Sequence, residues 1–199
     1  MRFIAVGVMF LALFAPVAAA PVCESGRDLR LAATAAYANH DLAQAIAKLR
    51  VAIQACPEEP FYRFMLGNAL YRAGALADAA ASYEAFLEQR SGDIEAHISL
   101  GFAAYELGDH SKAVREWTAA VRLEPESPLA HAALAAGLFA AGDEQNAAVQ
   151  CRLAQTLDPR YSRPEELAVD IRWKPQVREV LHLVLRLVES QEGGSENVP

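Results

Sequence analysis

The sequence lacks the surplus of basic residues that binding to nucleic acid requires. Acidic residues outnumber Lys and Arg by 25 to 18, which gives a formal charge of −7 at pH 7. Domains that bind DNA or RNA normally carry a basic stripe that neutralises phosphates. β-branched residues are also sparse, and alanine dominates the hydrophobic 53% of the chain. This composition favours close-packed helices over a β-sandwich, so we expect an all-α protein with no nucleic-acid partner.

The motifs of common enzyme classes are also missing. The chain has no Cys-x-x-Cys or haem-attachment motif, no phosphate-binding loop ending in Gly-Lys-Ser or Gly-Lys-Thr, no Ser-x-x-Lys and no Gly-x-Ser-x-Gly. His97 and His131 are 34 residues apart, but no third metal ligand recurs beside them, which favours a structural role for both. We therefore predict that the protein is not an enzyme, and we predict no cofactor, no metal site and no catalytic residue.

The first twenty residues differ in composition from the rest of the chain. Arg2 gives a short basic start, an apolar run covers 3–14, Pro16 ends the run, and small residues follow at 18–20. This order is typical of a secretory signal peptide. We predict that 1–20 is a signal peptide and that 21–25 leads into the mature domain. The expected location is outside the cytoplasm, in the periplasm of a bacterium.

Two alternatives for the N-terminus are less favoured. An uncleaved 1–20 segment would anchor the chain, and it would then be the protein's contact with the membrane, but the apolar run before Pro16 is short for a spanning helix. A lipoprotein modified at Cys23 is the other alternative. Val22 precedes this cysteine and no leucine stands three positions before it, which fits the lipoprotein signal poorly.

A repeat with a period of 34 residues covers most of the chain. The segments GNALYRAG at 67–74, GFAAYELG at 101–108 and AAGLFAAG at 135–142 are in register. Other positions keep the same step, namely Ala45, Ala79, Ala113 and Ala147, then Pro57, Ser91, Pro125 and Pro159, then Tyr37, Tyr71, Tyr105 and Phe139. The third copy also carries Leu100-Gly101, Ala113, Trp117 and Pro125. This pattern resembles the tetratricopeptide repeat (TPR), a helix–turn–helix unit.

The resemblance implies an all-α, right-handed α-solenoid of four 34-residue helix–turn–helix repeats with a C-terminal capping helix. The units fall at 26–59, 60–93, 94–127 and 128–161. One unit cannot bury its own apolar face, so stacking supplies the core. Gly67 and Gly101 lie inside first helices, where glycine costs about 1 kcal/mol relative to alanine. We expect a neighbouring helix to pass there too closely for a Cβ atom.

The family pattern is not complete. Its first-helix tryptophan is replaced by Leu29, Arg63, His97 and His131, and its tyrosine by Ala36, Leu70, Ala104 and Leu138. These replacements keep the architecture but place small or aliphatic residues at some positions where larger side chains usually pack.

The period ends after Pro159, and we predict a capping region at 162–190. Its apolar residues have helical spacing at Val177, Val180, Leu181, Val184, Leu185 and Val188. Terminal repeats must hide an apolar face, so this helix is expected to cover the fourth unit. A partner-binding or membrane-surface helix is the alternative. The polar, glycine-rich segment 191–199 is expected to be a disordered tail.

The resemblance also implies a concave groove lined by the first helices of the units. The groove positions that we predict to bind a partner are Arg30, Tyr37, Phe61, Phe64, Asn68, Tyr71, Arg72, Phe102, Tyr105 and Phe139. Aromatic side chains in an exposed groove are common anchors of protein recognition, although the same rings can pack between helices. The family's clamp for chaperone carboxylates is not expected, because Arg30 fits it but Thr34, Met65, Glu95 and Ser99 do not.

These features favour a non-catalytic scaffold or peptide-binding adaptor of the bacterial cell envelope, with a protein or peptide as the partner. One alternative is a structural assembly protein that associates through the helix at 176–189. Another is an accessory subunit of an envelope enzyme.

The chain contains three cysteines, and export would place them in an oxidising compartment. Cys23 precedes the first helix of unit one and Cys56 ends its second helix, and antiparallel helices bring these two ends together. A Cys23–Cys56 disulfide is therefore expected, with an intermolecular bond or a free Cys23 as the alternative. Cys151 takes the aromatic position of the fourth unit and is expected to be a small buried hydrophobe.

The Cys23–Cys56 disulfide can be tested by mapping peptides of the mature chain without reduction. We expect a cross-linked peptide pair that contains both cysteines. On the chain-entropy model such a bond would stabilise the fold by about 3–4 kcal/mol, so reduction should lower the denaturant midpoint. Finding both thiols free in protein purified from an oxidising compartment would contradict the prediction.

Overall fold

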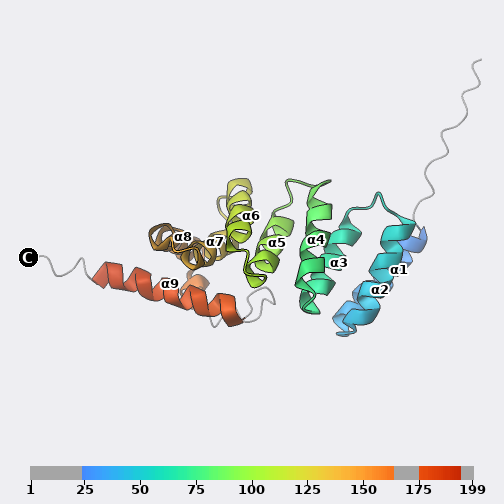
Figure 1. The fold of residues 1–199 in the computed structure, drawn as a ribbon, viewed down its shortest axis with the longest axis horizontal. Helices are drawn as coiled ribbons and strands as arrows, with labels where there is room; N and C mark the ends of the chain where they lie inside the picture. The colour runs from blue at the N-terminus through green and yellow to red at the C-terminus, as the bar shows by residue number, and fades with distance from the viewer. Residues whose placement is uncertain (1–23, 164–174, 194–199) are drawn as a thin grey trace, which may run out of the picture.

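The computed structural model describes residues 24–163 and 175–193, and within these ranges it contains helices and connecting turns but no strand (Figure 1). The signal peptide predicted at 1–20, the lead-in up to 23 and the tail from 194 lie outside the described residues. The helices are α1 (Glu24–Ala38), α2 (Leu42–Ala55), α3 (Phe61–Arg72), α4 (Leu76–Leu87), α5 (Ile94–Glu106), α6 (His110–Leu123), α7 (Pro128–Ala140), α8 (Glu144–Leu157), the 3₁₀ helix η1 (Pro159–Ser162) and α9 (Pro175–Gly193). The all-α prediction is confirmed.

The helices α1–α8 form four antiparallel hairpins, each joined by the same tight turn. In three hairpins the turn passes through a glycine with positive φ, at Gly74, Gly108 and Gly142, and in the first hairpin it passes through His40 at φ 62°. The backbone N–H of each of these residues donates to a carbonyl three residues back, and the next N–H donates five residues back. These bonds satisfy carbonyls that a helix end leaves unpaired.

Most second helices begin with an aspartate cap. The Asp41, Asp109 and Asp143 side chains accept hydrogen bonds from the backbone N–H three residues on, in α2, α6 and α8. Such a cap stabilises a helix start by about 1 kcal/mol. The second unit differs, because Ala75 precedes α4 and offers no side-chain oxygen.

The hairpins stack in chain order along the long axis of the molecule, so each unit contacts the next (Figure 1). The small residues that set the period lie at the centre of this stack. Ala45, Ala79, Ala113 and Ala147 are all fully buried, and side chains without Cγ atoms let the helices approach closely. The solenoid predicted from the 34-residue period is therefore confirmed.

The helix-interior glycines make room for large aromatic side chains. A Cβ atom on Gly101 would lie 2.3 Å from Nε1 of Trp117, and one on Gly67 would lie 2.5 Å from Cε1 of Tyr83. Both distances are far inside van der Waals contact. The expected close approach is present, but the close neighbour is a ring from the second helix of the same unit rather than the backbone of another helix. In unit one the positions of the glycine and the facing ring hold Ala33 and Leu49. In unit four they hold Ala135 and Cys151.

Trp117 also joins the third unit to the fourth. Its ring is fully buried, its indole N–H donates to the Ile98 carbonyl at 3.1 Å, and its far edge would lie 2.8 Å from a Cβ atom on Gly137. Phe102 meets the ring edge-on at a centroid distance of 5.2 Å. The tryptophan therefore packs between two first helices, α5 and α7.

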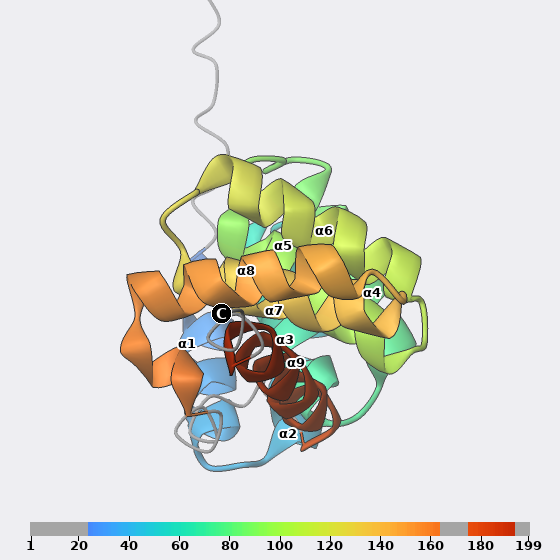
Figure 2. The same cartoon turned by 90° about the vertical axis from the view of Figure 1, so that its left-hand side faces the viewer.

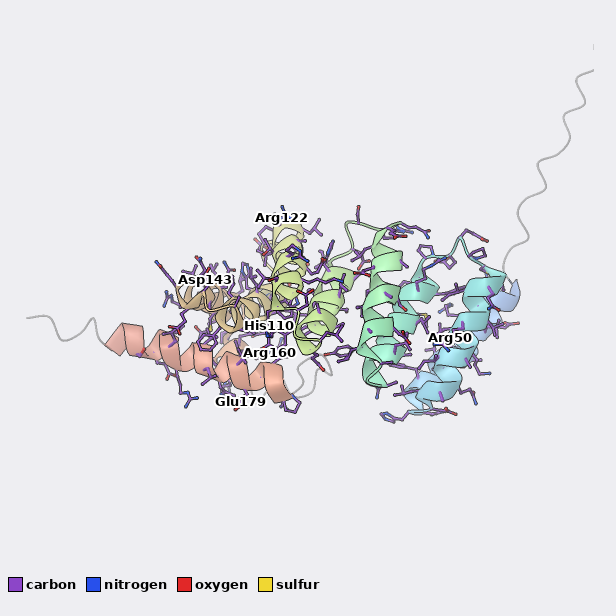
Figure 3. The ribbon with its side chains drawn as sticks, in the orientation of Figure 1. Arg50, His110, Arg122, Asp143, Arg160 and Glu179 are labelled. Carbon is purple, nitrogen blue, oxygen red and sulfur yellow. The ribbon has the colours of Figure 1, made fainter. Side chains whose placement is uncertain are left out.

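Helix α9 covers the end of the solenoid, as predicted for the cap. It packs against both α7 and α8, and Figure 2 shows it crossing beneath them. Its buried face consists of Val177, Leu181, Val184, Leu185 and Val188. Glu179 lies on the opposite side and points away from the repeats (Figure 3). The helix continues to Gly193, past the predicted start of the tail at 191. Among the described helices, none is long and apolar enough to cross a membrane.

His97 and His131 take structural positions in neighbouring units. Each ring has one nitrogen near the carbonyl of the preceding turn, Ser91 at 3.0 Å and Pro125 at 2.9 Å. The other nitrogen lies 2.8 Å from the Glu116 carboxylate in the case of His97 and 2.6 Å from the Gln150 amide oxygen in the case of His131. The hydrogen bond to Glu116 raises the pKa of His97 above its ordinary value.

Because Gly101 contacts Trp117, the effect of Gly101→Ala on the free energy of unfolding should depend on whether the tryptophan is present. Gly101→Ala gains about 1 kcal/mol of helix propensity but overpacks the ring at a cost of about 1–3 kcal/mol, so we expect net destabilisation in urea unfolding. In a Trp117→Leu background, which resembles the Ala33–Leu49 pair of unit one, the same change should be neutral or stabilising. Gly92→Ala is the control, because nothing lies within 4 Å of its Cβ position. Equal effects of Gly101→Ala in both backgrounds would contradict the steric explanation.

The His97–Glu116 pair predicts a defined pH dependence of stability. Because the pKa of His97 is raised in the folded state, the contribution of the pair is complete below the ordinary histidine value and is lost as pH rises through the raised pKa. The urea midpoint of the wild type should therefore exceed that of Glu116→Gln at about pH 5 and approach it by about pH 9. Glu116→Gln gives His97 the same kind of partner that His131 has. A difference that does not change with pH would contradict this assignment.

Candidate functional site

The first helices of units one to three surround a cavity of about 220 Å³ on the groove side of the solenoid. A smaller cavity of about 100 Å³ adjoins it and shares Tyr37 and Asn68 as lining residues. The larger cavity is lined by Tyr37, Phe64, Asn68, Tyr71, Arg72, Tyr83, Glu95, Ser99 and Phe102. Rings form most of the wall, and a few polar groups converge on it, which is the composition of a typical binding pocket.

Helix α3 supplies the central wall of the cavity. Phe64, Asn68 and Arg72 follow each other at four-residue steps, so they lie on one face of the helix. Phe64 is held by two rings of α4, Tyr83 at 5.8 Å and Phe86 at 5.3 Å between centroids. The wall therefore changes from apolar at Phe64 to cationic at Arg72.

Hydrogen bonds fix the polar side chains of this wall. The Tyr83 hydroxyl donates to Oδ1 of Asn68 at 2.8 Å, which orients the amide and leaves its N–H groups as donors. The Tyr71 hydroxyl donates to Glu106 of α5 at 2.5 Å. These bonds join α3 to α4 and to α5, so the wall is preorganised.

Arg72 is the cationic group of the cavity. Its guanidinium lies 4.5 Å from the centroid of the Tyr37 ring, a distance at which a cation is attracted to the face of the ring. Nη2 of Arg72 also lies 2.8 Å from Nδ1 of His40, and because the guanidinium can only donate, the imidazole nitrogen accepts. The two contacts come from α1 and from the turn that follows it.

The structure brings together six of the ten predicted groove residues. Tyr37, Phe64, Asn68, Tyr71, Arg72 and Phe102 line the one cavity, whereas Arg30, Phe61, Tyr105 and Phe139 do not line it. Tyr105 stacks on His110 at 4.8 Å and on Trp117 at 5.8 Å, and burial raises the pKa of its hydroxyl. Phe61 is half exposed beside Phe64. Figure 3 shows His110 near the start of α6.

At one of the repeated groove positions the side chains become more buried along the chain. At this position Thr34 is exposed, Asn68 is half-buried, and Phe102 and Ala136 are fully buried. In the fourth unit α7 lies against α9, so the accessible part of the groove belongs to the first three units.

Sequence reasoning did not assign Tyr83 or His40 to this site, and it considered Glu95 and Ser99 only as positions where the family's carboxylate clamp is absent. Tyr83 belongs to a second helix and reaches the cavity only because Gly67 leaves space for its ring. His40 did carry a signal, because it stands where the other three units have glycine.

The predicted disulfide lies only partly within the described residues. Cys56 is fully buried and disulfide-bonded, but Cys23 lies outside the described residues, so their pairing stays a prediction. Cys151 is a free thiol with 1% exposure, and burial raises its pKa to about 11. Within 24–163 and 175–193, no cluster of three or more His, Cys, Asp or Glu side chains is arranged to hold a metal ion.

Comparison with known proteins agrees with the repeat geometry. Residues 30–94 and residues 94–127 match the tetratricopeptide repeat family. Residues 30–127 are therefore tetratricopeptide repeats. No curated protein matches the sequence.

Solved structures share the TPR fold of this chain at low sequence identity. A crystal structure of MamA protein is 17% identical with a TM-score of 0.68, and the match covers 88% of this chain and 99% of that one. MamA 41-end from Desulfovibrio magneticus RS-1 is 16% identical with a TM-score of 0.67, covering 84% and 97%. A tetratricopeptide repeat protein from Parabacteroides merdae ATCC 43184 is 19% identical with a TM-score of 0.67, covering 86% and 63%. At these identities the likeness establishes the fold alone.

Proposed function

We propose that this TPR protein is a non-catalytic scaffold that binds an extended segment of a protein partner in the groove of its first three units. TPR folds generally serve protein–protein interaction, and the described residues offer one preformed cavity with this composition. The observation that carries the proposal is the α3 wall, where an apolar ring, an oriented amide and a guanidinium stand in a row and face the cavity.

The geometry supports binding of a peptide better than binding of a small metabolite. The larger and smaller cavities adjoin through Tyr37 and Asn68, so together they form an elongated depression across α1, α3 and α5. Side chains of an extended segment alternate in direction, and successive anchors can occupy neighbouring depressions. The rigid rings lose little conformational entropy when a ligand binds, which favours affinity.

The cellular setting is part of the proposal. The signal-like composition of 1–20 supports export to the bacterial envelope, where the protein would present its groove to a periplasmic partner. The alternative of assembly through the C-terminal helix is less favoured, because the apolar face of α9 is already buried against α7 and α8 of the same chain.

A blocked groove tests the proposed function. Glu95 is an exposed lining residue of the cavity, so Glu95→Trp should fill the cavity with a ring and leave the core unchanged. We expect a library of random twelve-residue peptides, displayed on phage, to yield binders of the wild type whose affinity falls at least about tenfold in the variant, as at binding hot spots.

Glu88→Trp is the matched control. Glu88 is exposed at the end of α4 and lines neither cavity, so this change removes the same charge and adds the same ring elsewhere. Binding to this variant should equal binding to the wild type. If no peptide is enriched, or if both variants bind the selected peptides as the wild type does, the groove is not a peptide site.

A further inference from the structure

We propose that the groove selects a peptide with an acidic side chain four residues from a large apolar side chain, and that His40 positions Arg72 to bind the acid. This inference rests on the proposed function and adds the chemistry of the ligand. It also assigns a role to a residue outside the cavity wall.

His40 adopts a backbone conformation that the other three units leave to glycine. Its φ is 62°, against 79°, 81° and 85° at Gly74, Gly108 and Gly142. The backbone hydrogen bonds of the turn are the same in all four units. The turn therefore requires the left-handed conformation, and the His40 side chain adds no hydrogen bond to it. Strain held by a non-glycine residue commonly marks a functional position. The difference between His40 and glycine is the ring, and the ring contacts Arg72.

Arg72 forms no salt bridge with a described carboxylate, although Glu95 lines the same cavity. Its contacts are the neutral ring nitrogen of His40 and the face of Tyr37, and among the described residues no carboxylate lies within salt-bridge distance of it. The side chain is half-buried, so its charge is partly removed from water. A guanidinium has five N–H donors in a plane, and most of them remain for a ligand. In proteins, a carboxylate side chain matches the geometry of such a fork and can bind it through two hydrogen bonds.

The order of side chains along α3 sets the spacing of the ligand. Phe64 and Arg72 are eight residues apart in a helix that rises 1.5 Å per residue, so they are separated by about 12 Å along its axis. An extended peptide advances about 3.3 Å per residue, so four residues cover that distance and return the side chain to the same side. Asn68 lies between the two anchors and can donate to a backbone carbonyl of the peptide.

The opposite wall carries one acidic lining residue, Glu95. Glu95 and Glu106 both belong to α5, and Glu106 accepts the hydroxyl hydrogen bond of Tyr71. The negative charge of Glu95 disfavours an acidic side chain on the α5 side of the cavity and favours the α3 side. The two walls therefore act together in orienting the carboxylate toward Arg72.

Defined peptides test the inference. The probes are labelled nine-residue peptides of Gly and Ser that carry one Phe and one Glu four positions apart, in both orders, with Gln in place of Glu as the matched probe. With the wild-type protein we expect one Glu peptide to bind about fivefold more tightly than its Gln counterpart, the range of a partly exposed ion pair. In Arg72→Gln this ratio should fall to about one.

His40→Gly separates positioning from structure. Glycine is the residue of the other three turns, so this variant should be at least as stable as the wild type. If His40 positions Arg72, the Glu-to-Gln affinity ratio should fall by about half even though stability is kept, since the guanidinium loses its fixed orientation. If the Glu-to-Gln affinity ratio is the same as in the wild type, His40 does not position Arg72.

The remaining outcomes distinguish this inference from the proposed function. Equal binding of Glu and Gln peptides, lost in Glu95→Trp, would overturn the acidic preference and leave the groove as a peptide site. Binding of neither peptide would overturn the acidic–apolar spacing, and the proposed function would then depend on the library result alone. A preference for Glu that survives in Arg72→Gln would place the acid elsewhere and overturn the role of Arg72.

Discussion

The contact of a large ring with a helix that lacks a side chain at that point is the constraint on which the solenoid depends. Trp117 and Tyr83 each fill the space that a Cβ atom would occupy on Gly101 and Gly67. The contact sets how closely the two helices of a unit approach, and through Gly137 it also sets how the next unit sits on Trp117. The glycines weaken their own helices, and the buried rings offset this cost. The outer units have the same architecture. There the first helix carries Ala33 or Ala135 in place of glycine, and the facing side chain of the second helix is smaller than a ring.

Much of the fold follows from the sequence because the repeat is in register over four units. The period predicted the helices and the turns, and the helical spacing of apolar residues after the period ends predicted the capping helix. The cavity lies among the predicted groove positions of units one to three. The shape of the site could not be predicted, because it depends on which rings turn inward. Tyr105 has the same register as Tyr37 and Tyr71, but its ring packs on Trp117 and His110 and does not line the cavity. Tyr83 reaches the cavity from a second helix, which a pattern of first-helix positions does not include.

The same packing explains why the groove is open at one end and closed at the other. Larger side chains pack against the first helix of the third unit, and α9 packs against that of the fourth. At the groove position that runs from Thr34 to Ala136, burial therefore increases along the chain. Different parts of the chain therefore contribute to stability and to recognition. The buried core runs through all four units, the C-terminal end adds the capping helix, and the first units supply the accessible polar groups of the groove. In the turn after α1, the positive φ of His40 allows its side chain to reach Arg72, which lines the cavity.

The central claim is that an extended segment lies along α3 in the groove of the first three units. It is tested most directly by NMR, by adding a library-selected peptide to the isotope-labelled mature chain and following the side-chain signals of Asn68 and Arg72 together with the backbone amides. The account predicts that the largest shift changes fall on α3, on Tyr37 and on the facing part of α5, with those of α9 unchanged. Shift changes concentrated on α8 and α9, with the Asn68 and Arg72 signals unmoved, would contradict it.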